Sequence, residues 1–437
     1  MKKYNRILIG AGCLALLLAS WLIAINSKSA TEKQFELMEK AAALINDGIY
    51  VLAVPLLEEA AGYNTVHTGD VEETLKKSYL ELINTQGYNM KYTDLLETQM
   101  NRAKAGPAVF AEAANYYLEI SKIPDALEIL RTGIEKTGDT GLIDLYEKNR
   151  YIYGINRTAY DYVTAIFDST IQVQRNGLWG LAGSGGDLLL PCEYERISTF
   201  NTDRAIVKKD GEIYAVNIDN NRIAKLNENA ADFGNFANDR IPLLIDGGWQ
   251  RATGDFSIGT VSFEQIGMYS EGYAAAKTGG KWGVVGMAFD WLLPPEYDGI
   301  IQDELGRCCA RSAVFAQKNG MVYLFIKGQQ VGNAFDDARP FSTEGYAAVK
   351  RNGKWGFIDI DGAVVFDFTF DDALSFGQHL AAIRQDELWG YIGLNGSIVI
   401  EPVFFEAKSF SGGSAPVLTE RGWQLITLLE YKKGVSL

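Results

Sequence analysis

Three hydrophobic patterns follow one another along the 437-residue chain. Residues 7–25 form a run of 19 without charge. From about residue 31 to 154, apolar residues recur at helical spacing, and from about residue 160 they alternate with polar residues in short segments. A period near 3.6 predicts amphipathic helices, and strict alternation predicts strands. The sequence therefore predicts one membrane-spanning helix, then a helical region, then a region made mainly of β-strands.

The apolar run 7–25 is close to the length of about 20 residues that spans a hydrocarbon core. Lys2, Lys3 and Arg6 precede it, and such a basic flank stays in the cytoplasm. We therefore expect residues 1–6 to be a cytoplasmic tail and 7–25 to be a single-pass signal-anchor at the cell membrane. The bulk of the chain would then be extracytoplasmic.

Two other interpretations of the N-terminal segment are disfavoured. A cleaved signal peptide usually has a shorter apolar region, and the one passable cleavage site is Ser27-Lys-Ser29. Lipid attachment at Cys13 is disfavoured because Gly-Ala-Gly before it is a poor signal. We favour an uncleaved anchor, followed by a linker over residues 26–34.

The helical region, residues 35–155, has small and large residues at recurring positions. The pattern is Phe110, Ala113, Ala114, Tyr117, Ala126, Leu130 and Gly133, and upstream Leu37, Ala41, Leu44, Ala53, Leu57 and Ala60. This pattern resembles an array of about three tetratricopeptide-like units, and the resemblance implies a concave surface that binds peptides. A simple α-hairpin spacer is the alternative.

A Trp-Gly pair recurs through the β-region, at 179–180, 282–283, 355–356 and 389–390. The last two pairs lie 34 residues apart, and Trp249 and Trp423 stand in degenerate copies. A fixed period of this length is typical of solenoids, propellers and arrays. We count about eight units between residues 160 and 437.

Each unit is predicted to contain three short strands, for example 347–351, 355–359 and 363–366, with a tight turn at Asn352-Gly353. Its tryptophan would pack in the core, because an exposed Trp at every period would favour aggregation; a ladder that stacks ligands is the alternative. The glycine would leave a bare strip for an aromatic side chain of the next strand. The predicted fold class is a mainly β repeat array, either a propeller-like toroid or an open β-superhelix, preceded by the helical segment and one transmembrane helix. We favour the toroid.

The repeated unit resembles the WG-repeat family of bacteria over about the last 280 residues. The resemblance implies a non-catalytic β-repeat region and supplies no catalytic residues. The residues assigned a structural role in the repeat are Trp179, Gly180, Trp249, Trp282, Gly283, Trp355, Gly356, Trp389, Gly390 and Trp423.

Charge and composition exclude several classes of site. A net charge of −14 disfavours nucleic acid and anionic lipid as partners and favours basic or cation-dependent ones. The two histidines, His67 and His379, fall in different regions, which disfavours zinc and Ser-His-Asp sites. Four cysteines are too few for a disulfide framework, and we expect Cys308 and Cys309 to be buried apolar side chains.

The remaining candidate motifs are weak. Gly183-Ser-Gly-Gly186 lacks the Lys-Ser/Thr of a phosphate loop and is expected to be a hairpin turn. Asp359-Ile-Asp361-Gly362 is half of a calcium loop without the bidentate Glu. Acidic residues that could catalyse glycoside hydrolysis recur at each period, as structural residues do. We expect no catalytic residues, no cofactor and no metal.

The function predicted is a membrane-anchored, extracytoplasmic, non-enzymatic scaffold for protein–protein interaction, with protein partners that are unknown. A cell-envelope glycan-binding protein is the alternative, with Trp291 as its clearest aromatic platform. A hydrolase is the third and weakest hypothesis.

Overall fold

The computed structural model describes residues 29–226 and 229–430. The chain forms two compact units, Met1–Tyr146 and Glu147–Leu437. The predicted tail, the predicted transmembrane segment 7–25 and the start of the linker lie outside the described residues. Within residues 29–226 and 229–430, no helix is long and apolar enough to cross a membrane.

The first unit is helical, as predicted, whereas its tetratricopeptide-like character stays a prediction. Its helices are α2 (Ala30–Asn46), α3 (Tyr50–Ala61), α4 (Thr68–Glu81), α5 (Tyr88–Met100), α6 (Pro107–Glu119) and α7 (Ile123–Thr137). A further helix, α8 (Thr140–Asn149), begins in this unit and ends three residues beyond it. Ser29 and Glu32 form a capping box at the start of α2, in which each side chain accepts a backbone N–H of the other residue.

Close packing of the helices explains one glycine of the predicted pattern. A Cβ added at Gly133 in α7 would come within 2.8 Å of Phe110 in α6 and of Leu142 in α8. Phe110 and Leu142 are both buried. The absent side chain therefore lets three helices approach one another.

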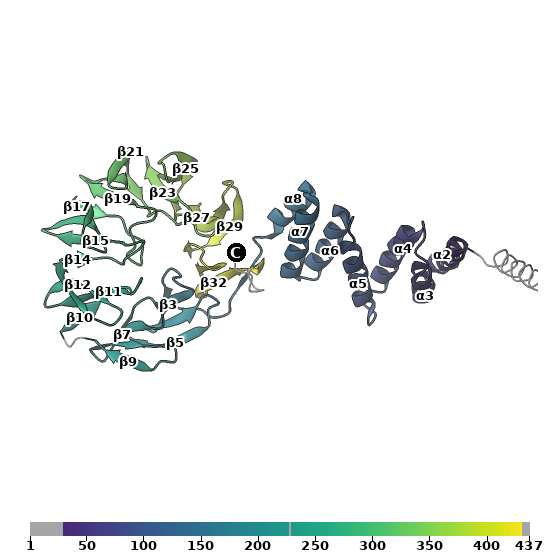
Figure 1. The fold of residues 1–437 in the computed structure, drawn as a ribbon, viewed down its shortest axis with the longest axis horizontal. Coiled ribbons are helices and arrows are strands. Elements are labelled where there is room, and N and C mark those ends of the chain that lie inside the picture. Colours follow the sequence, from purple (N-terminus) through teal and green to yellow (C-terminus); the bar gives the residue numbers. More distant parts are fainter. Residues whose placement is uncertain (1–28, 227–228, 431–437) are drawn as a thin grey trace, which may run out of the picture. The chain divides into compact units, whose positions relative to one another are not determined.

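The second unit is built from eight four-stranded antiparallel sheets arranged in a ring (Figure 1). We number these blades in chain order. Blade 1 holds β2 (Tyr162–Val163), β3 (Thr170–Arg175), β4 (Leu178–Gly183) and β5 (Leu188–Tyr194). Blade 2 holds β6 (Arg196–Ile197), β7 (Ala205–Lys209), β8 (Glu212–Val216) and β9 (Arg222–Lys225). Blade 3 holds β10 (Ala230–Phe233), β11 (Arg240–Ile245), β12 (Gly248–Thr253) and β13 (Ile258–Phe263). Blade 4 holds β14 (Gln265–Ile266), β15 (Tyr273–Thr278), β16 (Lys281–Gly286) and β17 (Trp291–Tyr297).

Blades 5 to 8 repeat this order. Blade 5 holds β18 (Gly299–Ile300), β19 (Ala313–Lys318), β20 (Met321–Ile326) and β21 (Gln329–Phe335). Blade 6 holds β22 (Asp337–Ala338), β23 (Tyr346–Arg351), β24 (Lys354–Asp359) and β25 (Val364–Phe370). Blade 7 holds β26 (Asp372–Ala373), β27 (Leu380–Gln385), β28 (Leu388–Gly393) and β29 (Ile398–Phe404). Blade 8 holds β30 (Glu406–Ala407), β31 (Ser414–Thr419), β32 (Gly422–Leu428) and β1 (Tyr153–Ile155).

The ring is closed by the first strand of the unit. Strand β1 pairs with β32, with Tyr153 opposite Leu428 and Ile155 opposite Ile426. Residues from the start of the unit thus complete its last blade. Figure 1 shows the fourth strands, such as β21 and β25, at the rim of the ring.

The predicted fold class is corrected as follows. The favoured toroid is confirmed as an eight-bladed β-propeller, and the open superhelix is wrong. Each unit has four strands rather than the predicted three. The first strand was not predicted because in most blades it has only two residues, such as Asp337–Ala338, too few to show an alternation of apolar and polar residues. The described helices all precede the propeller, as predicted, but none of them is long and apolar enough to cross a membrane, so the predicted transmembrane helix is not supported.

The turns assign two faces to the propeller. The turn between the second and third strands is tight, as at Asn352 and Gly353, whose φ values are +52° and +81°. We call the side that carries these turns the hairpin face. The turns between the first and second strands and between the third and fourth strands lie at the other ends of the strands, on the opposite face.

Candidate functional site

The repeated tryptophans belong to the packing between and within the blades. Trp355, Trp389 and Trp423 are only 2%, 7% and 3% exposed, whereas Trp179, Trp249 and Trp282 are half-buried. Each one stands opposite an aromatic residue of the neighbouring strand segment. These partners are Tyr194 for Trp179, Phe263 for Trp249, Tyr297 for Trp282, Phe370 for Trp355, Phe404 for Trp389 and Tyr160 for Trp423.

The glycine that follows four of these tryptophans is required by the main chain of the fourth strand. Between Trp389 and Tyr391 the register skips, so that these residues face Phe404 and Ile400. The extra residues of the fourth strand bulge over Gly390, where an added Cβ would lie 2.5 Å from the Ile400 carbonyl oxygen. Added Cβ atoms at Gly180, Gly283 and Gly356 would lie 2.5–2.7 Å from equivalent carbonyl oxygens.

Main-chain atoms of the fourth strand, rather than the expected aromatic ring, thus lie nearest to all four glycines. At Gly283 an aromatic ring also comes close, since Trp291 Cζ3 would lie 2.8 Å from the added Cβ. Trp291 also packs against Phe263, with ring centroids 6.2 Å apart. Its position is that of a packed side chain rather than of a separate aromatic platform.

Two of the tryptophans carry a cation on their rings. The Arg339 guanidinium lies 4.5 Å from the centroid of Trp355, and the Lys408 ammonium lies 5.0 Å from that of Trp423. Arg339 and Lys408 hold equivalent positions, directly after the first strands of blades 6 and 8. Such contacts stabilise a cation that has lost part of its water.

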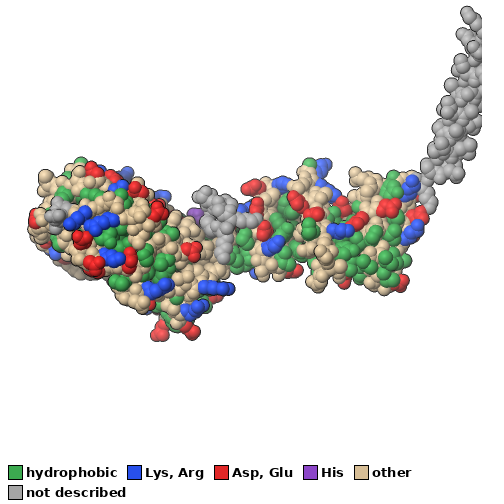
Figure 2. Space-filling model, turned by 90° about the horizontal axis from the view of Figure 1, so that it is seen from below, with side chains coloured by type: hydrophobic (Ala, Val, Ile, Leu, Met, Phe, Trp, Pro, Cys, Tyr) green, Lys and Arg blue, Asp and Glu red, His purple; other side chains and the backbone are tan. Residues whose placement is uncertain are grey.

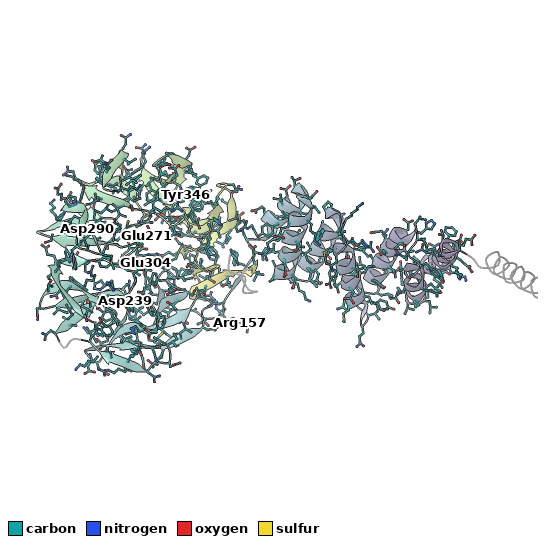
Figure 3. The ribbon with its side chains drawn as sticks, viewed as in Figure 1. Arg157, Asp239, Glu271, Asp290, Glu304 and Tyr346 are labelled. Carbon is teal, nitrogen blue, oxygen red and sulfur yellow. The ribbon has the colours of Figure 1, made fainter. Side chains whose placement is uncertain are left out.

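The axis of the propeller is filled by a loop of blade 5. The connection from the first to the second strand covers residues 301–312 in blade 5, against 374–379 in blade 7. We call the extra segment, Gln302–Arg307, the axial plug. Figure 3 shows Glu304, in this segment, toward the middle of the ring.

The axial plug touches blades on several sides of the ring. Leu305 is buried in a cluster with Ala237 and Met268 of blades 3 and 4, against which Phe167 of blade 1 packs. The Asn235 amide donates to the Leu305 carbonyl at 2.9 Å, and the Met268 N–H donates to that of Gly306 at 3.0 Å. The plug thus closes the axis with the chain's own residues.

The plug is itself fixed by one carboxylate. Asp303 accepts the N–H groups of Leu305 and Arg307 at 3.0 and 2.9 Å, and it also accepts Arg307 Nε at 2.6 Å. Because Asx-type turns of this kind set the local backbone, the plug has a defined conformation. Its tip places Glu304 2.6 Å from the Lys408 ammonium of blade 8.

On the opposite face, several turns between the first and second strands contact the equivalent turn of the next blade. Glu344 accepts the backbone N–H of His379 at 2.8 Å, and Gln378 accepts that of Gly413 at 2.6 Å. Glu271 accepts the N–H of Arg311 in the same way. These side chains fix the spacing of neighbouring blades.

A shallow cavity of about 600 Å³ lies on this face between blades 2 and 3. Its lining is Arg204, Asp239, Arg240, Thr253, Gly254, Asp255 and Ser257. Hydrogen bonds from Thr253 and from Ser257 hold the pKa of Asp255 below its usual value. Arg204 and Arg240 each pair with the acidic residue before them, so the Asp255 carboxylate is the charge of the lining that these two pairs do not offset.

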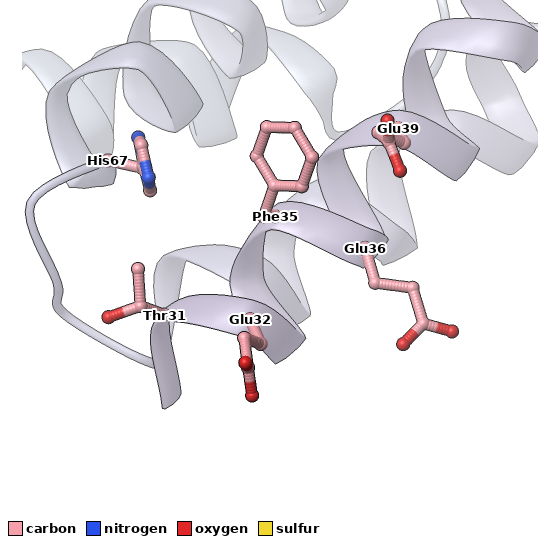
Figure 4. Close-up of a pocket in the computed structure, with 6 residues that line it drawn as sticks. All are labelled: Thr31, Glu32, Phe35, Glu36, Glu39 and His67. Atoms are coloured by element: carbon pink, nitrogen blue, oxygen red, sulfur yellow. The ribbon is translucent and has the colours of Figure 1, made fainter. Parts of the chain in front are cut away.

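The helical unit has a second shallow cavity, of about 610 Å³, at its first helix. Figure 4 shows Phe35 between α2 and His67, with three glutamates along α2; the full lining is Thr31, Glu32, Phe35, Glu36, Glu39 and His67. Phe35 is 50% exposed, and its ring centroid lies 6.0 Å from that of His67. An exposed ring beside carboxylates suits a cationic side chain.

The cysteines and the glycine-rich motif are structural. Cys308 and Cys309 are buried behind the plug, and burial raises the pKa of both thiols, that of Cys309 to about 12. A thiol with so high a pKa is a poor nucleophile. The segment Gly183–Gly186 forms a tight turn, closed by the Gly186 N–H on the Gly183 carbonyl at 2.8 Å. Among the residues that the structure describes, no three His, Cys, Asp or Glu side chains could hold a metal ion.

Sequence reasoning missed the axial plug, the aromatic partners and the two cations. The plug has a signal in the sequence, because blade 5 has a longer first connection than the other blades. The aromatic partners also have one, since an aromatic residue ends six of the eight fourth strands, as in Tyr194, Tyr297 and Phe404.

The model of the "WG containing repeat" matches residues 179–212, 262–282, 334–355, 355–389 and 389–423. The chain contains WG repeats. All the matched segments fall in the propeller, and together they cover less than half of the chain. No curated protein matches the chain.

Several solved structures resemble the propeller. Hsv2 of Kluyveromyces lactis is 12% identical, and the match covers 60% of this chain and 97% of that one, with a TM-score of 0.34. PorZ of Porphyromonas gingivalis is 14% identical over 61% of this chain and 42% of that one, with a TM-score of 0.34. A eukaryotic initiation factor is 9% identical over 63% and 87%, with a TM-score of 0.40. No functional property is carried over from these proteins.

Proposed function

We propose that the protein is a non-enzymatic scaffold that binds other proteins through the surfaces of its two units. The observation that carries this proposal is the filled axis of the propeller. Leu305 and Glu304 occupy the place where an axial ligand would bind, so binding falls to the faces and the rim. WG repeats and a propeller fold are compatible with such a role.

The surfaces of both units support the proposal. On the side that Figure 2 shows, Lys, Arg, Asp and Glu are interspersed over the propeller, and apolar side chains gather on the helical unit. The most exposed large apolar residues of the helical unit are Phe35, Val51, Leu52, Val66 and Met90. Exposed apolar groups rimmed by charges are typical of protein-binding surfaces.

Photo-crosslinking in intact cells tests the proposal. A photoreactive phenylalanine analogue replaces Phe35 in the helical cavity in one variant and Phe405 on the propeller in a second; both side chains are about half exposed. The same analogue at buried Phe357 is the matched control. We expect discrete adducts with defined proteins from at least one exposed position and none from the control.

The competing functions give different results. Adducts with glycan rather than protein would favour the glycan-binding alternative. Turnover of a glycan, peptide or phosphoester by the purified chain, abolished by changing one carboxylate, would contradict a non-enzymatic role. A location outside the cytoplasm stays a prediction, since it depends on residues 7–25, outside the described part of the chain.

A further inference from the structure

The tip of the axial plug holds a carboxylate in a cage made by blades 8 and 1. Glu304 Oε2 accepts the Lys408 ammonium at 2.6 Å and the Tyr162 hydroxyl at 3.4 Å. The same ammonium lies 5.2 Å from the Tyr162 ring and 5.0 Å from the Trp423 ring. One carboxylate oxygen thus meets a cation that two aromatic rings hold in place.

Blades 8 and 1 supply the residues of the cage, whereas the carboxylate inside it, that of Glu304, comes from a blade that is not their neighbour. Glu304 belongs to blade 5 and stands 104 residues before Lys408 in the chain. The Lys408 side chain is only 9% exposed, against 28% for Glu304. A cation that has lost most of its water is stable only with an opposite charge beside it.

In blade 6, the cation equivalent to Lys408 is Arg339, and its carboxylate partner does not come from the axial plug. Arg339 lies on Trp355 as Lys408 lies on Trp423, and it pairs at 3.3 Å with Asp372, the first residue of the next blade's first strand. In blade 1 that first residue is Tyr162. The neighbouring blade therefore supplies a carboxylate to Arg339 but none at the equivalent position to Lys408, which pairs with Glu304 of the axial plug instead.

We propose that Lys408, Tyr162 and Trp423 form a receptor for a carboxylate side chain, which Glu304 occupies as an intramolecular ligand. An acidic side chain of a protein partner occupies the same receptor when the plug withdraws. This last step rests on the proposed scaffold function, whereas the receptor itself does not. Tyr162 is 39% exposed, so the receptor borders on solvent.

Chemical rescue of the full chain tests the receptor. Glu304→Ala removes about the volume of acetate and leaves Lys408 unpaired. Thermal unfolding is followed by tryptophan fluorescence, because seven of the eight tryptophans, all but Trp21, lie in the propeller. We expect Glu304→Ala to lower the midpoint of the propeller transition by several degrees. Acetate should restore more than half of this loss, whereas chloride at equal ionic strength should not.

Three variants separate the receptor from a general salt effect. In Glu304→Ala/Lys408→Met the acetate effect should disappear. In Asp371→Ala, which breaks the exposed ion pair with Lys354, acetate should act as it does on the unaltered chain. Glu304→Gln keeps the side-chain volume and replaces Glu304→Ala if the latter does not fold; it should unfold at a lower temperature than the unaltered chain. An unchanged midpoint, or an equal acetate effect in all variants, would overturn the receptor.

Short peptides test whether the receptor also binds an acidic side chain of another protein. The probes are an acetylated Gly-Glu-Gly amide and its Gln counterpart, added to Glu304→Ala. Stabilisation by the Glu peptide alone would support recognition of an acidic side chain in trans. Rescue by acetate without any peptide effect would keep the carboxylate receptor and reject protein side chains as its ligands, leaving the scaffold proposal to the crosslinking experiment.

Discussion

The helical unit and the propeller stabilise themselves in different ways. In the helical unit, charged side chains enter the core and pair across helices, as Glu72 does with Arg102 and Lys76 with Glu112. In the propeller the buried residues are mainly aromatic and aliphatic, and charged pairs such as Arg222 with Glu212 lie at the surface, whereas that of Lys408 with Glu304 lies at the axis. Polar pairs therefore specify how the helices stack, whereas apolar packing and a bulged main chain specify the blades.

This difference follows from geometry. A blade has two apolar faces that must bury against two neighbours, so a large ring at a fixed position is effective in every repeat. A helix of the first unit buries only one stripe, and its ends meet the ends of its neighbours. Substitutions in the two units should consequently have effects of different size.

The largest expected effect is that of the buried tryptophans. Trp355→Ala and Trp389→Ala should each lower the free energy of unfolding by about 3–5 kcal/mol, because each removes a large ring from the core. Both side chains contribute to packing around blade 7, so the double variant should be non-additive. Denaturant unfolding followed by circular dichroism measures the change. Half-buried Trp282→Ala is the control and should cost less. Wild-type stability of both variants would revive a ligand-stacking ladder.

The second largest loss of stability is expected from a substitution of the glycine beneath the bulge of the fourth strand. Gly390→Ala places a Cβ against the Ile400 carbonyl and should cost about 2–3 kcal/mol, since main chain cannot move aside as a side chain can. Gly185→Ala is the matched control, because no atom lies within 4 Å of its added Cβ. The same unfolding experiment applies. If both variants are equally stable, the bulge does not explain the conserved spacing of Trp and Gly within this chain.

Local patterns predicted more of this molecule than long-range ones. The helices, the hairpin at Asn352-Gly353 and the buried cysteines could be predicted, because spacing and turn chemistry act within a few residues. The closing strand Tyr153–Ile155 could not, since its partner lies more than 250 residues away and it is only three residues long. The axial plug, Gln302–Arg307, lies outside the repeated unit from which the strands were predicted. Nothing local in Gln302–Arg307 says that Glu304 meets Lys408 across the ring.

A smaller effect is expected from the buried carboxylate of the helical unit. Burial raises the pKa of Glu72, but hydrogen bonds from Arg102 and Gln99 outweigh it and hold the pKa below its usual value. Its stabilisation is therefore present above the pKa of the unfolded chain, about 4.3, and is lost as the pH falls through the folded value. Glu72→Gln should cost about 1 kcal/mol at neutral pH and flatten this acid dependence. The helical circular dichroism signal against pH measures both, and an unchanged profile would contradict the assigned role.

The smallest effect should come from an ion pair on the propeller surface. Asp371 and Lys354 lie 2.5 Å apart, but their side chains are 35% and 49% exposed. The hydrogen bond from Lys354 lowers the pKa of Asp371. Water and salt screen such a pair, and holding two mobile side chains offsets its attraction. Asp371→Asn should therefore leave the unfolding midpoint unchanged within error, at low and at high salt. A loss as large as that of Trp355→Ala would mean that surface charge, and not the packing of rings between blades, holds the propeller together.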